Sequence, residues 1–347
     1  MASQSLGAGR PWADLPTDIF DAVLRRLDIF DAVWLTGVCT SWAKAVANNP
    51  SLPFDMPCLL MTHEPDYYDA DDSYDDCMFD LHKRCTTRHI DDEPVTAFMR
   101  ELWGRWWVGA NGSWIATVDY YCNAQLINPY TGDWIELPPV PILPDVEWSH
   151  GIRCYAISRI VLCETPPLGS DNGAYLAIAL LDRPPRFVAI ARGSDQSWTI
   201  LKNKKRKWSK RYDDAIMHKG KIFAVVKSGD IYVWDVRAGY DERLCEPEML
   251  RGPNIGRPRY SVRQCYLAET VDGGRLLFAC TYGSPCPDER MGFYVEGMLL
   301  YELDINVAHD GWRRITSLGD HSLFLGLNYP FWASTQGKTS ICMHAVV

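Results

Sequence analysis

The sequence lacks any apolar run long enough to cross a membrane. The apolar stretch around Tyr175–Leu181 is far shorter than the ~20 residues that span a bilayer. The first residues, MASQSLGAGR, contain neither a basic segment nor an apolar core, so they do not resemble a secretory signal. Of the 347 residues, 47% are apolar and 23% are charged, which is the composition of a folded globular protein. We therefore expect a soluble intracellular protein with about two domains.

An excess of basic charge and closely paired cysteines are also missing. The net charge of −9 opposes binding to nucleic-acid phosphates, so we expect protein partners and neither nucleic acid nor membrane. The 12 cysteines contain no C-x-x-C pair. In a reducing compartment they are expected to be small buried apolar side chains.

Sequence signatures of catalysis are absent as well. The chain contains no G-x-G-x-x-G, P-loop, H-E-x-x-H or G-x-S-x-G sequence. This predicts a non-catalytic protein without a cofactor. A pair of catalytic carboxylates brought together only by folding would leave no such signature, so an active site within the folded domain stays open as a lesser alternative.

One group of residues imitates a metal site. Cys77, His82, Cys85 and His89 offer thiolate and imidazole ligands at spacings of five, three and four residues. Such ligands bind zinc tetrahedrally. The alternative is a chance grouping in a loop, which we favour because the first spacing is irregular and carboxylates crowd one side.

Two segments carry strong local charge. Residues 64–80 contain eight acidic residues in seventeen, so residues 51–94 are expected to form an acidic linker or insertion. Residues 202–211 contain seven basic residues in ten, and this run is either a solvated connection or a nuclear localisation segment. The basic residues of the run are Lys202, Lys204, Lys205, Arg206, Lys207, Lys210 and Arg211.

The first fifty residues have a helical pattern. Apolar positions recur at helical spacing from Asp14 to Asn49, which predicts three short helices. The first begins at Pro16, the second is capped by Asp28, and the third runs from about Val38. A unit of about forty residues buries too little surface to be stable alone. Its apolar stripes must therefore pack on the rest of the chain or on a partner.

Short strands separated by Gly, Pro, Asn and Asp follow from about Leu102. Candidate strands begin near residues 106, 113, 124, 134, 175, 186, 197, 221, 231, 275, 298 and 312. This density of strands predicts an all-β sandwich, barrel or propeller. In three places a strand ends, a turn follows, and a new strand opens with Trp134, Trp198 or Trp312. Although their spacing is irregular, the recurrence favours the blades of a propeller.

The N-terminal stretch WADLPTDIFDAVLRRLDIFDAVWLTGVCTSWAKAV resembles an F-box, the three-helix module that binds the Skp-family adaptor of SCF-type ubiquitin ligases. The resemblance makes residues 10–50 an F-box domain. It also implies the adaptor-binding residues, which are Leu15, Pro16, Ile19, Val23, Leu24, Leu27, Val38, Cys39 and Trp42.

The remainder, residues 95–347, resembles plant F-box proteins that carry domain of unknown function 295, a KIB-type β-propeller. The resemblance rests on NPYTGDWIELPPVP, DDAIMHKGKIFAVVKSGDIYVWDV and SLGDHSLFLGLN. It implies a mainly β fold in which the three-helix F-box precedes a propeller of about six to seven blades. Members of this family usually continue past the sequence ICMHAVV, so the sequence leaves open whether the propeller closes.

Together these resemblances imply a substrate receptor of an SCF-type E3 ubiquitin ligase in the nucleus, the cytoplasm or both. Its partners would be the adaptor, through it a cullin, and an unidentified target protein. The alternative is a protein-binding propeller outside any ligase, with a degenerate F-box. Two departures from the usual F-box pattern, Ile29 and Gly37, keep that alternative open. A helical cap folded onto the β domain is a third possibility.

Overall fold

The computed structural model describes the following residues: 15–24, 26–27, 35, 38–47, 58–61, 77–80, 85–89, 105–119, 121–128, 132–139, 157–167, 174–182, 186–193, 195–201, 211–236, 246–255, 261–285, 293–303, 311–334 and 344–345. The chain divides into two compact units, Met1–Glu101 and Leu102–Val347.

The first unit contains two described helices and one small sheet. The helices are α1 (Thr17–Leu24) and α3 (Thr40–Ala47). The antiparallel sheet has the order β1-β2-β3, with strands β1 (Cys58–Met61), β2 (Cys77–Asp80) and β3 (Cys85–His89). The first and third predicted helices are therefore confirmed. The second, expected after Asp28, lies outside the described residues.

A small core holds the two helices together. Phe20 and Leu24 of α1 and Val46 of α3 are buried against one another. The ring of Phe20 meets the indole of Trp42 edge-on, with ring centroids 5.1 Å apart. Residues four apart share one face of a helix, so Phe20 and Leu24 form the inner stripe of α1. The core is small, as the length of the segment predicts.

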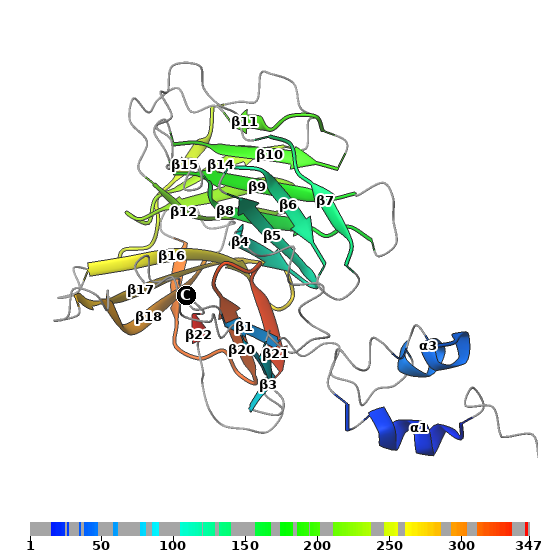
Figure 1. The fold of residues 1–347 in the computed structure, drawn as a ribbon. Coiled ribbons are helices and arrows are strands. Elements are labelled where there is room, and N and C mark those ends of the chain that lie inside the picture. Colours follow the sequence, from blue (N-terminus) through cyan, green and yellow to red (C-terminus); the bar gives the residue numbers. More distant parts are fainter. Residues whose placement is uncertain are drawn as a thin grey trace, which may run out of the picture. The chain divides into compact units, whose positions relative to one another are not determined.

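The second unit is built of antiparallel sheets, and no helix occurs among its described residues. Four sheets have four strands each, in the orders β4-β5-β6-β7, β11-β10-β9-β8, β12-β13-β14-β15 and β16-β17-β18-β19. A further sheet has the order β21-β20-β22, in which β22 runs parallel to β20. In Figure 1 the four larger sheets follow one another in chain order, from teal to orange. The prediction of a mainly β fold is confirmed.

The strands of the second unit have these bounds: β4 Arg105–Asn111, β5 Trp114–Asp119, β6 Ala124–Ile127, β7 Trp134–Glu136, β8 Ile157–Glu164, β9 Leu176–Leu181, β10 Val188–Arg192, β11 Thr199–Leu201, β12 Tyr212–His218, β13 Lys221–Val226, β14 Ile231–Asp235, β15 Glu248–Leu250, β16 Ser261–Glu269, β17 Leu276–Pro285, β18 Phe293–Leu303, β19 Trp312–Ile315, β20 His321–Leu325, β21 Phe331–Ser334 and β22 His344–Ala345. Every candidate strand from the sequence falls on one of them. The strands that were not among those candidates are β8, β12, β15, β16, β20, β21 and β22.

Successive sheets bury their faces against each other. One apolar cluster joins the sheet of β4–β7 to that of β8–β11, a second joins β8–β11 to β12–β15, and a third joins β12–β15 to β16–β19. The first strands β4, β8, β12 and β16 are neighbours in that order. At Gly109 a Cβ atom would lie 1.8 Å from the carbonyl oxygen of Ile160, so only glycine allows β4 to approach β8 this closely.

Two buried carboxylates connect β12 to β16. Asp213 Oδ2 accepts a hydrogen bond from the amide of Cys265 at 3.0 Å, and Asp214 Oδ2 accepts one from the amide of Leu267 at 2.9 Å. These amides belong to the first strand of the next sheet. A buried amide without a partner is costly, so the two aspartates satisfy groups that the edge of the sheet would otherwise leave unpaired.

Asp214 also forms a buried ion pair. Its Oδ1 lies 3.2 Å from Arg159 Nη1, and the two side chains are 0% and 4% exposed. Arg159 Nη2 also donates to the carbonyl of Asn328 at 3.1 Å, which links β8 to the segment after β20. Burial raises the pKa of Asp214 to about 6, while Arg159 and two backbone amides oppose this shift.

Tryptophans tie the outer strands of neighbouring sheets. Trp198 Nε1, just before β11, donates to the carbonyl of Pro138 beyond β7 at 2.7 Å. Trp312 Nε1 in β19 donates to the carbonyl of Arg251 beyond β15 at 3.0 Å. The third tryptophan of the sequence pattern, Trp134, is 59% exposed. The recurrent Trp position therefore connects sheets at two of its three occurrences.

Candidate functional site

Three large apolar side chains in the described part of the helix pair are exposed. Ile19 and Val23 of α1 are 48% and 40% exposed, and Val38, just before α3, is 58% exposed. Ile19 and Val23 are four residues apart and so lie on one face of α1. Apolar side chains grouped on a small helical unit are typical of a surface that binds a partner.

The other predicted adaptor-binding residues divide between core and surface. Leu24 is buried, and Leu15, Leu27 and Trp42 are partly buried against the helix core. Pro16 is exposed, and Cys39 is half-buried. The structure therefore makes Leu24 part of the fold of the helix pair, whereas Ile19, Val23 and Val38 are available to a partner.

Local sequence explains where the two helices begin. The carbonyl of Pro16 accepts the amides of Ile19 and Phe20 at 3.1 and 3.0 Å, which closes the first turn of α1. Asp18 places a negative charge in that turn, where the helix dipole favours it. The carbonyl of Cys39 accepts the amide of Ala43 at 2.9 Å and so starts α3.

The predicted zinc ligands fall in the small sheet of the first unit. Backbone pairing sets Cys77 opposite His89 and Cys85 opposite Asp80. His82 lies outside the described residues. The zinc site remains a weak sequence-based candidate. Across the part of the chain whose side chains are described, no group of His, Cys, Asp and Glu could hold a metal ion.

Most of the basic run lies outside the described residues, which include only its last member, Arg211. The side chain of Arg211 is 54% exposed, and its Nε lies 3.4 Å from Asp182 Oδ2. A surface ion pair of this kind contributes little to stability. The nuclear localisation segment remains a prediction.

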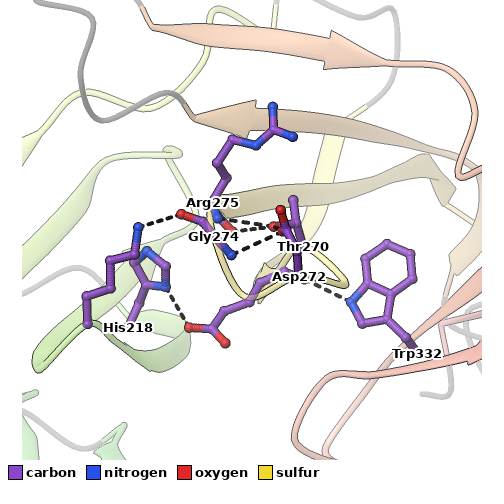
Figure 2. Close-up of polar contacts among 8 residues, drawn as sticks. His218, Thr270, Asp272, Gly274, Arg275 and Trp332 are labelled. Carbon is purple, nitrogen blue, oxygen red and sulfur yellow. Dashed lines mark hydrogen bonds and ion pairs between the residues drawn. The ribbon is translucent and has the colours of Figure 1, made fainter.

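A polar group with fixed geometry lies at the turns of two neighbouring sheets (Figure 2). His218, the last residue of β12, is only 1% exposed, and its Nδ1 lies 2.5 Å from Oε1 of Glu269. Glu269 ends β16 and is 32% exposed. The backbone carbonyl of Glu269 accepts a hydrogen bond from Trp332 Nε1 at 2.9 Å. Both the carboxylate and the backbone carbonyl of Glu269 are therefore held in place.

The β16–β17 turn beside this group is itself stabilised. Asp272 Oδ1 accepts hydrogen bonds from the hydroxyl of Thr270 and from the amide of Gly274, the latter at 3.1 Å. The hydrogen bond from Thr270 is the main reason that the pKa of Asp272 is lowered. Lys219 Nζ, in the β12–β13 turn, donates to the carbonyl of Gly274 at 2.5 Å. The two turns are thus joined, as Figure 2 shows.

A small open depression of about 180 Å³ lies next to Glu269. Its lining residues are Ile216, Glu269, Thr270, Val271, Gly273, Tyr329, Pro330 and Trp332. They come from β12, the β16–β17 turn and the segment leading into β21. Sequence reasoning missed this site, because three segments far apart in the chain build it. The Val-Asp-Gly-Gly turn after Thr270 was the one local signal.

Among the described residues, no helix is long and apolar enough to cross a bilayer.

Two sequence families match the two parts of the chain. A model of the F-box domain matches residues 12–54, and a model of the KIB1-4 β-propeller matches residues 78–343. The chain therefore combines an F-box domain with a β-propeller. It belongs to the KIB1-4 β-propeller family, which agrees with the predicted KIB-type propeller. The further label, domain of unknown function 295, stays a prediction.

Relatives in Arabidopsis thaliana bear F-box protein names. At4g22170 is 25% identical over 225 residues, which cover 63% of this chain and 59% of the relative. At4g22180 is 26% identical over 132 residues, which cover 37% of this chain and 29% of the relative. At1g10110 is 26% identical over 129 residues, with 37% and 28% covered. The chain thus matches less than two thirds of the length of each of these relatives. Neither matching family describes an enzyme.

Proposed function

We propose that this protein is the substrate-recognition subunit of an SCF-type E3 ubiquitin ligase. The observation that carries the proposal is the exposure of the apolar side chains Ile19, Val23 and Val38, inside the segment that the F-box model matches. Because each of these side chains is already about half covered, burying the rest against an adaptor contributes on the order of 1 kcal/mol for each one. The Skp-family adaptor, and through it a cullin, would be the partners.

In this role the protein performs no covalent chemistry. The F-box domain holds the adaptor, while the β-propeller binds the target protein. Ubiquitin transfer is carried out by the E2 enzyme bound to the cullin. The receptor contributes by raising the effective concentration of target lysines near the E2 thioester.

The domain bounds, the number of blades and the location in the cell are part of the same proposal. We assign residues 10–50 to the F-box domain, 51–94 to an acidic linker and 95–347 to the propeller. The four four-stranded sheets are proposed as blades in a propeller of about six to seven. From the basic run at residues 202–211 we also propose a location in the nucleus, the cytoplasm or both.

Co-precipitation with adaptor and cullin tests the proposal. The tagged chain is expected to recover both partners from a mixture of purified components. Leu15→Ala combined with Trp42→Ala should abolish recovery of both, because the two side chains support the binding face from within the helix pair. Lys44→Ala, an exposed position on α3, serves as the matched control and should recover both.

The same experiment separates the alternative functions. Recovery of the adaptor without the cullin would favour a protein-binding propeller outside any ligase. Recovery of neither by the unmodified chain would overturn the proposed function and favour a degenerate F-box. Equal recovery by the double variant would show that adaptor binding does not depend on Leu15 and Trp42.

A further inference from the structure

We infer that the depression beside Glu269 binds a basic side chain of the target protein, an arginine or a lysine that lies next to an apolar residue. The inference rests on the proposed function and specifies the chemistry of the target segment. It draws on the position of one carboxylate, the apolar walls around it and the charges nearby.

The carboxylate of Glu269 is held in one orientation. Its Oε1 lies against Nδ1 of the buried His218, and its backbone carbonyl is tied to Trp332. Among the described residues, none forms a hydrogen bond or ion pair with Oε2 of Glu269. Because the side chain is 32% exposed, a charge from outside can reach it. Positioning the carboxylate in advance reduces the entropy cost of forming a charge-assisted hydrogen bond.

The walls of the depression are mostly apolar. Trp332, Tyr329 and Pro330 form one side, and each is half-buried. Val271 stands on the rim of the β16–β17 turn and is 55% exposed. Arginine and lysine have apolar stems that pack on such surfaces, and a guanidinium is attracted to the face of an indole. An apolar residue next to the basic one would contact Val271.

The neighbouring charges favour a cation over an anion. Asp272 lies in the same turn, and the hydrogen bonds that lower its pKa keep it ionised. The two nearby cations are already engaged. Lys219 Nζ is directed to the carbonyl of Gly274, and Arg275 Nη1 lies 2.6 Å from Oε1 of Glu302. Neither cation lines the depression, so the charged group that a ligand meets there is the carboxylate of Glu269, among mostly apolar side chains.

Peptide selection tests the inference without knowledge of the target. A phage library of random 12-residue peptides is selected on the full chain bound to its adaptor. Binding of a selected peptide is then measured by fluorescence anisotropy, next to the same peptide in which citrulline replaces arginine. Citrulline keeps the shape of arginine and removes its charge. We expect selected peptides to share a basic residue beside an apolar one, and citrulline to weaken binding at least tenfold.

Variants of the chain assign the effect to the depression. Glu269→Gln should bind the arginine and citrulline peptides with equal affinity. Val271→Ser, on the exposed rim, should weaken both peptides by a similar factor. Glu248→Gln, an exposed carboxylate on β15 outside the depression, should behave like the unmodified chain.

Two results would overturn the inference. One is a selection without enrichment of basic residues, and the other is undiminished preference for arginine over citrulline in Glu269→Gln. Adaptor affinity is measured on the same samples. A variant that retains the adaptor but not the preference for arginine therefore bears on the depression alone, whereas loss of adaptor binding by the unmodified chain bears on the proposed function.

Discussion

The helix pair and the stacked sheets differ in which of their groups find partners within the chain. In the sheets, buried polar groups find partners within the chain: Asp213 and Asp214 accept the amides of β16, and Trp198 donates to Pro138. In the helix pair, the outer apolar side chains, including Ile19 and Val23, remain exposed. Paired buried groups make the sheets a scaffold, on which apolar side chains such as Val271 also stay exposed. In α1 the exposed apolar side chains Ile19 and Val23 share one helix face, which is suited to binding a partner.

The largest effect should come from breaking the internal contacts of the sheets. Asp214→Ala leaves the buried guanidinium of Arg159 unpaired and removes the acceptor of Leu267. Removing one partner of a buried ion pair costs about 3–5 kcal/mol in the free energy of unfolding. Chemical denaturation at pH 7.5 measures this change. Asp320→Ala, at an exposed turn, should stay within about 0.5 kcal/mol of the unmodified chain, and equal stability of the two variants would contradict the account.

The pH dependence of stability also tests the contribution of the buried Asp214. Because burial raises the pKa of Asp214 from 3.8 to about 6, the folded chain holds this proton more tightly than the unfolded chain does. The resulting stabilisation is complete below about pH 4 and is lost as the pH rises through 6, by on the order of 3 kcal/mol. Denaturation from pH 4 to 7 should show this loss in the unmodified chain. The loss should be smaller in Asp214→Asn, where only the raised pKa of the buried Asp213 still contributes to it; a parallel pH profile in that variant would contradict the assignment.

Substitutions on the two faces of α1 should separate binding from folding. Ile19→Ala and Val23→Ala remove exposed side chains, so each should weaken adaptor affinity roughly tenfold with little change in the helix signal of the free chain. Leu24→Ala removes a buried side chain and should reduce that helix signal. Isothermal titration calorimetry and circular dichroism measure the two quantities. Unchanged adaptor affinity in both exposed variants would remove the contrast between the helix pair and the sheets.

The smallest effect concerns the tryptophans. Trp198→Phe loses the hydrogen bond to Pro138 in a buried setting, which should lower the free energy of unfolding by about 1 kcal/mol. Trp134→Phe, at the exposed position of the same pattern, should change it by less than about 0.5 kcal/mol. Thermal denaturation of both variants gives the comparison. Equal losses would mean that the indole hydrogen bond does not connect the sheets.

Strands with continuous apolar residues could be predicted from the sequence, as β9 and β13 show. Strand β16 was missed because Arg263, Gln264 and Cys265 interrupt its apolar pattern. In this strand the amide of Cys265 donates a hydrogen bond to the carboxylate of Asp213, a residue of another sheet. No local pattern contains such information, since the pairing exists only after folding.

The two candidate sites differ in the same way. The face of α1 lies within one short segment, so helical spacing predicted its apolar residues. Spacing did not separate the exposed Ile19 from the buried Leu24, because that depends on how α3 packs against α1. The depression beside Glu269 joins residues of β12, β16 and β21, and no spacing in the sequence connects them.

The central claim is that the helix pair is completed by an adaptor. Size-exclusion chromatography with light scattering tests it most directly, on the full chain expressed alone and together with a Skp-family adaptor. The account predicts that the chain and the adaptor elute together as a stoichiometric complex. A stable monomer that ignores the adaptor would contradict it, and would mean that the apolar face of the helices is covered by the chain itself.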